Sequence, residues 1–282
     1  MVPMTAIEVR GLRKSYGAHA AVAGIDLSVA TGEVFALLGP NGAGKTTTVE
    51  ILEGHRRRNG GSVRVLGADP GDAGRAWRAR IGIVAQNAAD SGDLTVEEAV
   101  RHLAGMYPRP RPVAEVIDLV GLAEHRRQRV GTLSGGQRRR VDVALGIVGR
   151  PELVFLDEPT TGFDPAARRQ FWQLIRTLSA EGATILLTTH YLDEAEALAD
   201  RLVVVARGTV VAEGTPATLG GRATAEATVT WRDATGTRTE RTADPDGLLR
   251  RLAAAADADL STLTVTRPTL EDTYLALIGE NR

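Results

Sequence analysis

The sequence predicts an α/β fold built on a doubly wound sheet of parallel strands. Two observations carry this prediction. The stretch GPNGAGKT, residues 39–46, lies between a short apolar run and a helical pattern, and apolar runs then alternate with helical stretches as far as residue 214. A third observation adds a second layer, because residues 5–30 alternate between apolar and polar positions, as in antiparallel strands.

The first part of the chain predicts strands on either side of one helix. IEVRGL and AGIDLSVA, within residues 5–30, form the antiparallel pair, and EVFALL, Glu33–Leu38, is a buried strand that ends before a glycine. A helix is expected over Lys45–Leu52. Further strands are expected at VRVLG, residues 63–67, and at IGIVAQ, Ile81–Gln86.

A helical insertion is expected within about residues 87–150. Thr95 and Glu98 form a capping box ahead of an apolar face, and the prolines that begin at Pro108 end that helix. A second helix is predicted over Val113–Val120.

The parallel core resumes after the insertion, since parallel strands need helical crossovers. The expected elements are a strand at Leu153–Asp157, a helix at Ala166–Ala180, a strand at Ala183–Thr189, a helix at Leu192–Ala199 and two strands in residues 201–214.

A small α+β appendage is expected at residues 221–282, after a main domain at residues 5–220. AEATVTW alternates, DATG predicts a turn and TRTERT pairs back. A helix at LLRRLAAAA, a strand at LSTLTVT and a helix at TLEDTYLALIG follow.

Composition excludes several classes of protein. With 34 basic and 35 acidic residues the net charge is −1, which gives no general reason to bind nucleic acid. No cysteine is present, so disulfides and thiolate metal sites are excluded. The first ten residues lack the apolar core of a signal peptide, and apolar runs such as Leu202–Ala206 are far shorter than the roughly 20 residues of a membrane helix. Any membrane part is therefore expected on another chain.

The glycine-rich stretch matches the pattern GxxxxGK[ST] between a strand and a helix, which predicts a phosphate-binding loop. Backbone N–H groups of such a loop converge on phosphate oxygens at a helix N-terminus. Lys45 is expected on the β- and γ-phosphates and Thr46 on Mg²⁺. Only two of the basic residues are lysines, Lys14 and Lys45. The expected nucleotide contacts are Gly39, Pro40, Asn41, Gly42, Ala43, Gly44, Lys45, Thr46 and Thr47.

Two carboxylates follow the apolar strand at Leu153–Asp157. Asp157, at the strand tip, is expected in the magnesium shell. Glu158 is expected beside the γ-phosphate, where its carboxylate can polarise an attacking water. Acid pairs are common at strand ends, so the glycine loop is what makes this pair informative.

With both motifs in place, LSGGQ at Leu133–Gln137 resembles the signature sequence of ATP-binding cassette (ABC) proteins, the ATPase subunits of ABC transporters and a class of P-loop NTPase. The resemblance covers about residues 5–215. In that family the signature of one copy covers the γ-phosphate of ATP held by the other copy. The resemblance therefore implies a homodimer that clasps two ATP molecules, with Ser134, Gly135, Gly136 and Gln137 on the partner's nucleotide.

Other residues match the family pattern in order. Tyr16 in KSYG matches the aromatic that stacks on adenine, Gln86 the glutamine between core and insertion, and His190 the switch histidine. Asp164 in GFDP matches the loop after the catalytic acid, where Phe163 replaces the more usual leucine. The resemblance implies catalytic roles for Lys45, Gln86, Glu158 and His190, a magnesium shell of Thr46, Gln86 and Asp157, and nucleotide contacts for Tyr16 and Asp164.

The arginine triplets Arg56–Arg58 and Arg138–Arg140 are interpreted as solvated faces. Taken alone, Tyr16, Gln86 and His190 would be assigned to core filling, a turn and an ordinary satisfied histidine.

HYLDEAEALADR and the final RPTLEDTYLALIGE resemble the daunorubicin-resistance type of bacterial drug exporter. That type implies peripheral attachment at the cytoplasmic face of the membrane, with a separate permease that passes a drug, antibiotic or lipid-like substrate. The tail fits a stabilising cap on the core and a regulatory or dimer-bracing role equally well. An ABC importer and a non-transport soluble ABC ATPase are the alternatives, although no coiled-coil heptads of a DNA-repair ABC protein occur.

Overall fold

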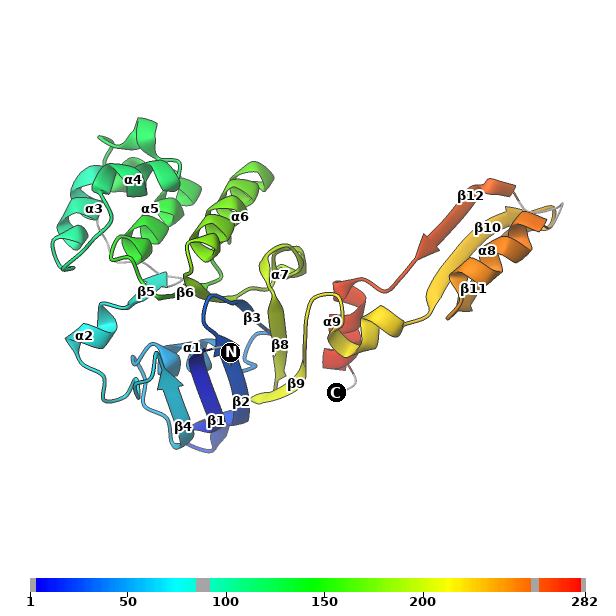
Figure 1. The fold of residues 1–282 in the computed structure, drawn as a ribbon, viewed down its shortest axis with the longest axis horizontal. Helices are drawn as coiled ribbons and strands as arrows, with labels where there is room; N and C mark the ends of the chain where they lie inside the picture. The colour runs from blue at the N-terminus through cyan, green and yellow to red at the C-terminus, as the bar shows by residue number, and fades with distance from the viewer. Residues whose placement is uncertain (1–3, 85–91, 255–258, 280–282) are drawn as a thin grey trace. The chain divides into compact units, whose positions relative to one another are not determined.

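The computed structural model describes residues 4–84, 92–254 and 259–279 of the chain (Figure 1). The chain divides into two compact units, residues 1–211 and 212–282. The roles expected of the two predicted domains, ATP binding for residues 5–220 and an accessory role for residues 221–282, stay predictions.

A six-stranded sheet forms the centre of the first unit, in the order β5-β6-β7-β3-β8-β9. The pairs from β5 through β8 are parallel, and β3 and β7 are buried at every position. This is the α/β architecture that the alternation of apolar runs and helices predicts. The strands are β3 (Val34–Leu38), β5 (Ile81–Val84), β6 (Leu153–Asp157), β7 (Thr184–Thr188), β8 (Arg201–Ala206) and β9 (Thr209–Gly214).

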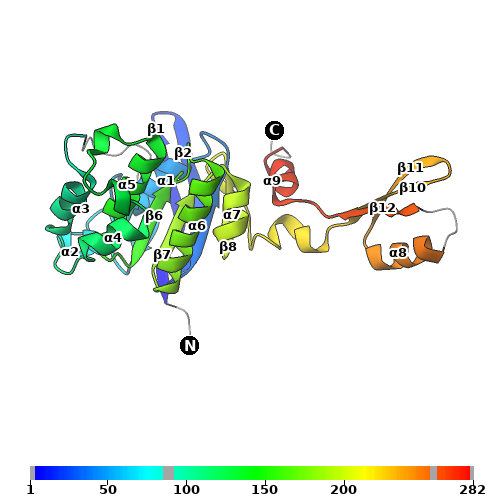
Figure 2. The same cartoon turned by 90° about the horizontal axis from the view of Figure 1, so that it is seen from above.

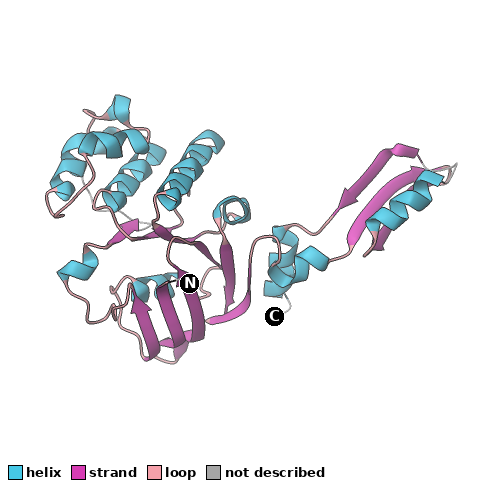
Figure 3. Ribbon diagram, viewed as in Figure 1, coloured by secondary structure: helices cyan, strands magenta, loops and turns pink. Residues whose placement is uncertain are grey.

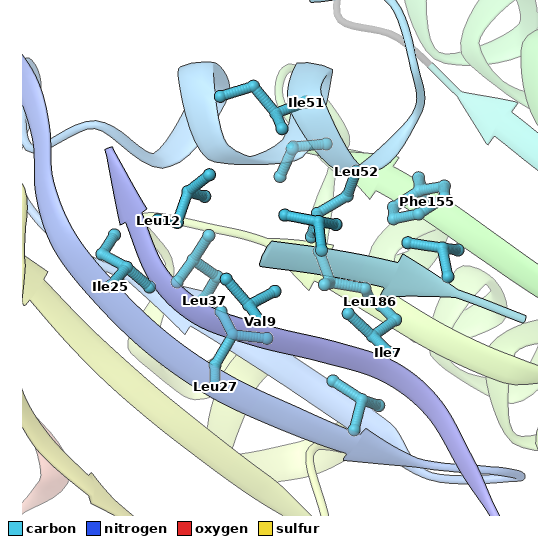
Figure 4. Close-up of a cluster of buried hydrophobic side chains, with 14 of the residues drawn as sticks. Ile7, Val9, Leu12, Ile25, Leu27, Leu37, Ile51, Leu52, Phe155 and Leu186 are labelled. Atoms are coloured by element: carbon cyan, nitrogen blue, oxygen red, sulfur yellow. The ribbon is translucent and has the colours of Figure 1, made fainter. Parts of the chain in front are cut away.

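A second, antiparallel sheet has the order β2-β1-β4. Its strands are β1 (Thr5–Tyr16), β2 (His19–Ala30) and β4 (Gly60–Val65). One buried cluster joins this sheet to helix α1 (Lys45–Leu52) and to the parallel sheet, with Ile7 and Leu27 packed in the same core as Leu52 and Phe155 (Figure 4). The loop before α1 is therefore anchored from both sheets.

Helices α3 (Val96–Ala104), α4 (Val113–Leu119) and α5 (Gly135–Ile147) lie together between β5 and β6 in the sequence (Figure 2). The predicted capping box is present, since Thr95 accepts from the N–H of Glu98 at 3.2 Å and Glu98 accepts from the N–H of Thr95 at 2.9 Å. The remaining helices of this unit are α2 (Arg75–Arg78), α6 (Pro165–Ala180), α7 (Leu192–Leu198) and the 3-10 turns η1 (Ala123–His125) and η2 (Val130–Thr132).

The second unit is a three-stranded antiparallel sheet, β11-β10-β12, with a helix on one face (Figure 3). Its buried apolar cluster consists of Val229, Leu248 and Leu252. The elements are η3 (Leu219–Thr224), β10 (Ala227–Asp233), β11 (Gly236–Thr242), α8 (Pro245–Ala254), β12 (Asp259–Thr266) and α9 (Leu270–Gly279). No helix in the described ranges combines the length and the apolar character needed to cross a bilayer.

Because the small cluster of the second unit is separate from the main core, its loss should act locally. Leu248→Ala is expected to cost about 2–5 kcal/mol of stability in this unit. Hydrogen exchange should rise over β10–β12 and α8 while β3 and β7 keep their protection. Leu275→Ala, at a leucine that is 53% exposed, is the control and should change little. Equal exchange throughout the chain in the Leu248 variant would contradict separate cores.

Candidate nucleotide-binding site

The glycine loop is shaped by close backbone approach. A Cβ atom on Gly39 would lie 2.2 Å from the carbonyl oxygen of Val205, and one on Gly44 would lie 2.4 Å from that of Ala21. Gly39 and Gly44 also have φ values of +155° and +102°. Only glycine satisfies both constraints. Strands β8 and β2 therefore fix the loop where it turns into α1.

Lys45 begins α1 and is buried. Its Nζ donates to the carbonyl oxygens of Gly39 at 2.7 Å and Pro40 at 3.2 Å. Burial lowers the pKa of Lys45, and the negative charges of Glu158 and Asp157 oppose that shift. The N-cap of α1 is Gly44, which has no side chain to cap the first-turn N–H groups. The loop thus joins an ammonium to a helix N-terminus, the two features that favour a phosphate.

The other residues predicted to contact the nucleotide differ in how exposed they are. Thr46 is exposed and Thr47 partly exposed on the first turn of α1. Pro40, Asn41 and Gly42 are exposed, whereas Ala43 is buried in the core.

The end of β6 carries the two predicted carboxylates. Asp157 Oδ1 accepts a hydrogen bond from the hydroxyl of Thr188 on β7. Glu158 has φ +46°, and its N–H donates to the carbonyl and hydroxyl oxygens of Thr188 at 3.1 and 3.2 Å. Nδ1 of His190 lies 3.4 Å from Glu158 Oε1. The structure therefore brings Asp157, Glu158 and His190 together. The two carboxylates are close enough to Lys45 for their charges to raise its pKa against the effect of burial.

Arg139 is a residue whose position the sequence interpretation got wrong. Instead of lying on a solvated face, it is buried on α5 and donates to the carbonyl oxygens of Asp157 at 2.6 Å and Pro159 at 3.2 Å. Its Nη1 lies 3.8 Å from Asp142 Oδ2. The helical period was the available signal, because Arg139 shares a face with Val143 and Ile147. Arg139 ties α5 to the backbone of the carboxylate pair.

The predicted signature residues begin α5. Ser134 is the N-cap, and its Oγ accepts from the N–H of Gln137 at 3.2 Å. Gln137 Oε1 accepts in return from the N–H of Ser134 at 3.0 Å. Gly135 is exposed and Gly136 partly exposed at the same helix end. The motif therefore presents an ordered helix N-terminus to solvent.

Three other predicted residues lie in different settings. Asp164 is the N-cap of α6, and its Oδ1 accepts from the N–H groups of Ala166 and Ala167 at 2.8 Å. Tyr16, at the end of β1, is 42% exposed, with the cations of Lys14 and Arg56 over its ring. Gln86 lies outside the described residues.

Comparison with known proteins identifies the family. Residues 22–161 match the model described as ABC transporter. A daunorubicin resistance ATP-binding protein of Streptomyces coeruleorubidus is 38% identical over 99% of this chain and 97% of its own length. The chain belongs to the ABC transporter ATP-binding proteins. The predicted resemblance to the daunorubicin-resistance type is confirmed.

Other relatives match a shorter part of the chain. A daunorubicin/doxorubicin resistance ATP-binding protein of Streptomyces peucetius is 46% identical over 76% of this chain and 66% of its own length. A Nod factor export ATP-binding protein of Paraburkholderia xenovorans is 42% identical over 77% of this chain and 73% of its own length.

Solved structures confirm the predicted cassette fold. An ATP-binding subunit of an ABC transporter has a TM-score of 0.72 with 24% identity, over 96% of this chain and 99% of that chain. A dimeric cassette in a post-hydrolysis state with ADP and Pi has a TM-score of 0.68 with 22% identity, over 74% of this chain and 98% of that chain.

The half-buried carboxyl of Asp142, beside Arg139, makes the stability of the protein depend on pH. Burial raises the pKa of Asp142 from 3.8 to about 6, against the opposing charges of Arg139 and Arg138. The native state thus holds this proton more tightly than the unfolded chain, so ionisation costs stability as pH rises from about 4 to 6. Asp142→Asn should raise the free energy of unfolding at pH 8 by up to about 3 kcal/mol and leave it nearly unchanged near pH 3, below the ordinary pKa of 3.8, since a shift of one unit is worth about 1.4 kcal/mol.

Urea unfolding at the two pH values measures this difference. Asp118→Asn, at an exposed acid on α4, is the matched control. The same gain at both pH values, or a gain in the control, would contradict a raised pKa at the half-buried Asp142.

Proposed function

We propose that this chain hydrolyses ATP as one half of a head-to-tail homodimer that powers export through a separate membrane permease. The observation that carries the proposal is the grouping of Lys45, Asp157, Glu158 and His190 beside the glycine loop, with the signature residues on a different helix. A C₂ dimer would place each signature on the nucleotide of the other copy.

In this proposal Lys45 and the first-turn N–H groups of α1 bind the phosphates of ATP. Glu158 accepts a proton from the attacking water. His190, whose Nδ1 lies 3.4 Å from the carboxylate of Glu158, orients that carboxylate and the γ-phosphate. Tyr16 offers an exposed ring for adenine. Ser134, Gly135, Gly136 and Gln137 contact the partner's γ-phosphate, and Asp164 at the N-terminus of α6 is assigned to the nucleotide-contacting loop.

Mg²⁺ fits the donors at this site, because Thr46 and Asp157 offer the hard oxygen ligands it prefers. Among the described residues no group of three or more His, Cys, Asp or Glu side chains could hold a metal by itself. Thr46 and Asp157 would hold it, with Gln86 as the third proposed ligand. The ion would neutralise charge on the phosphates.

The export assignment is supported by relatives whose names include daunorubicin resistance and Nod factor export. The proposed substrate is a drug, an antibiotic or a lipid-like molecule, and the proposed location is the cytoplasmic face of a bacterial membrane. Gln86 would transmit the presence of the γ-phosphate to the permease.

We assign residues 5–220 to ATP binding, with the helical subdomain at about 87–150, and residues 221–282 to an accessory domain. An importer would use the same core, and transport assays with the permease would separate the two directions.

Two substitutions separate binding from turnover. Glu158→Gln should retain ATP binding, lower the hydrolysis rate by at least about 100-fold and accumulate a dimer, because only the proton acceptor is lost. Lys45→Ala should abolish ATP binding and therefore dimerisation.

Hydrolysis assays and sedimentation with ATP and Mg²⁺ measure both effects. A Glu158→Gln variant that hydrolyses ATP at the normal rate would overturn the assignment of the base. A Lys45→Ala variant that still dimerises with ATP would overturn the assignment of the loop.

A further inference from the structure

A chain of side-chain hydrogen bonds leads from the signature motif to a histidine outside it. Gln137 Nε2 lies 2.9 Å from Nε2 of His125, and Nδ1 of His125 lies 2.9 Å from Gln128 Oε1. Gln128 Nε2 then donates to the hydroxyl of Thr132 at 3.2 Å and to its carbonyl oxygen at 3.4 Å. The three central side chains are only partly exposed.

Main-chain groups at the two ends fix the direction of every bond in this chain. The N–H of Ser134 can only donate, so the oxygen of Gln137 faces it and the NH₂ group faces His125. The carbonyl of Thr132 can only accept, so the NH₂ group of Gln128 faces it and the oxygen faces His125. His125 must then accept at Nε2 and donate at Nδ1. A neutral ring in the Nδ1–H form meets both requirements.

The network controls which groups of the signature remain available to a ligand. Gln137 takes up the N–H of Ser134, and the N–H of Gln137 is taken up by Ser134 Oγ. Ser134 Oγ still carries its own hydrogen, since it is bonded here as an acceptor. That hydroxyl and the N–H groups of Gly135 and Gly136 then point from the same helix end, the geometry that suits a phosphate.

We propose that His125 is a positioning residue for the signature motif, which holds Gln137 so that Ser134 and the two glycines form a ready phosphate-binding surface for the partner's ATP. This inference rests on the dimer of the proposed function. In this proposal His125 does not contact the nucleotide. It affects the contact between the signature and the ATP of the other copy, and it leaves the binding of ATP to the glycine loop of its own copy unchanged.

Three variants of the full chain test this role. His125→Phe keeps a ring and removes both nitrogens, while His125→Gln restores an acceptor toward Gln137. His102→Phe, on the exposed face of α3, is the matched control. Each is made alone for hydrolysis assays and in the Glu158→Gln background for dimerisation with ATP and Mg²⁺.

His125→Phe should raise the KM for ATP and the dimer dissociation constant by about three- to ten-fold, the worth of one hydrogen bond. ATP binding to the single subunit and the unfolding midpoint should stay the same, and His125→Gln should recover most of the loss. Wild-type values in His125→Phe, or a loss that His125→Gln and His102→Phe share, would overturn the role of His125. An unmodified chain that neither dimerises nor hydrolyses ATP would instead overturn the proposed function.

Discussion

The turn that follows β6 is the constraint on which the site depends. Glu158 has φ +46°, a left-handed conformation that a non-glycine residue adopts at a cost of about 1–3 kcal/mol. Two elements hold it there. Thr188 on β7 binds the N–H of Glu158, and Arg139 on α5 draws the carbonyls of Asp157 and Pro159 toward one guanidinium. The sharp turn separates the two acids, so that Asp157 bonds to Thr188 while Glu158 faces His190.

Arg139 also gives the cassette an internal connection. Helix α5 begins at Gly135 in the signature motif and, four residues later, carries Arg139, the side chain that holds the carboxylate turn. One buried side chain thus connects the helix that begins at the signature with the turn that carries the two acids.

The sequence predicted the elements well, because their signals are local. Apolar runs that end in glycine or aspartate defined β3 and β6, and the capping box at Thr95 defined the start of α3 to the residue. The predicted fold and family are confirmed. The grouping of Lys45, Glu158 and His190 could be expected because three parallel strands carry them to one edge of the sheet.

Other features could not be predicted from local patterns. The buried position of Arg139 depends on its hydrogen bonds to backbone carbonyls such as that of Pro159, about 20 residues away in the sequence. Only the tertiary fold brings these carbonyls to α5. The strained φ of Glu158 has no sequence signal, since a glutamate seldom adopts it. The bond between His125 and Gln137 crosses from a 3-10 turn to a helix, and no periodicity relates the two residues.

In the proposed head-to-tail dimer, ATP brings the signature of one copy onto the glycine loop of the other. Ala18 is exposed in the turn between β1 and β2, next to Tyr16, and Arg129 is exposed at the N-cap of η2, just before the signature. The chain has no cysteine, so a donor dye on Ala18→Cys and an acceptor dye on Arg129→Cys, in separate Glu158→Gln preparations, report only intermolecular distances. Energy transfer in the mixture should appear with ATP and Mg²⁺, and should exceed that of a mixture labelled at Ala18 on both copies. Transfer that is absent when ATP is bound, or that is stronger between the two Ala18 labels, would contradict the head-to-tail dimer.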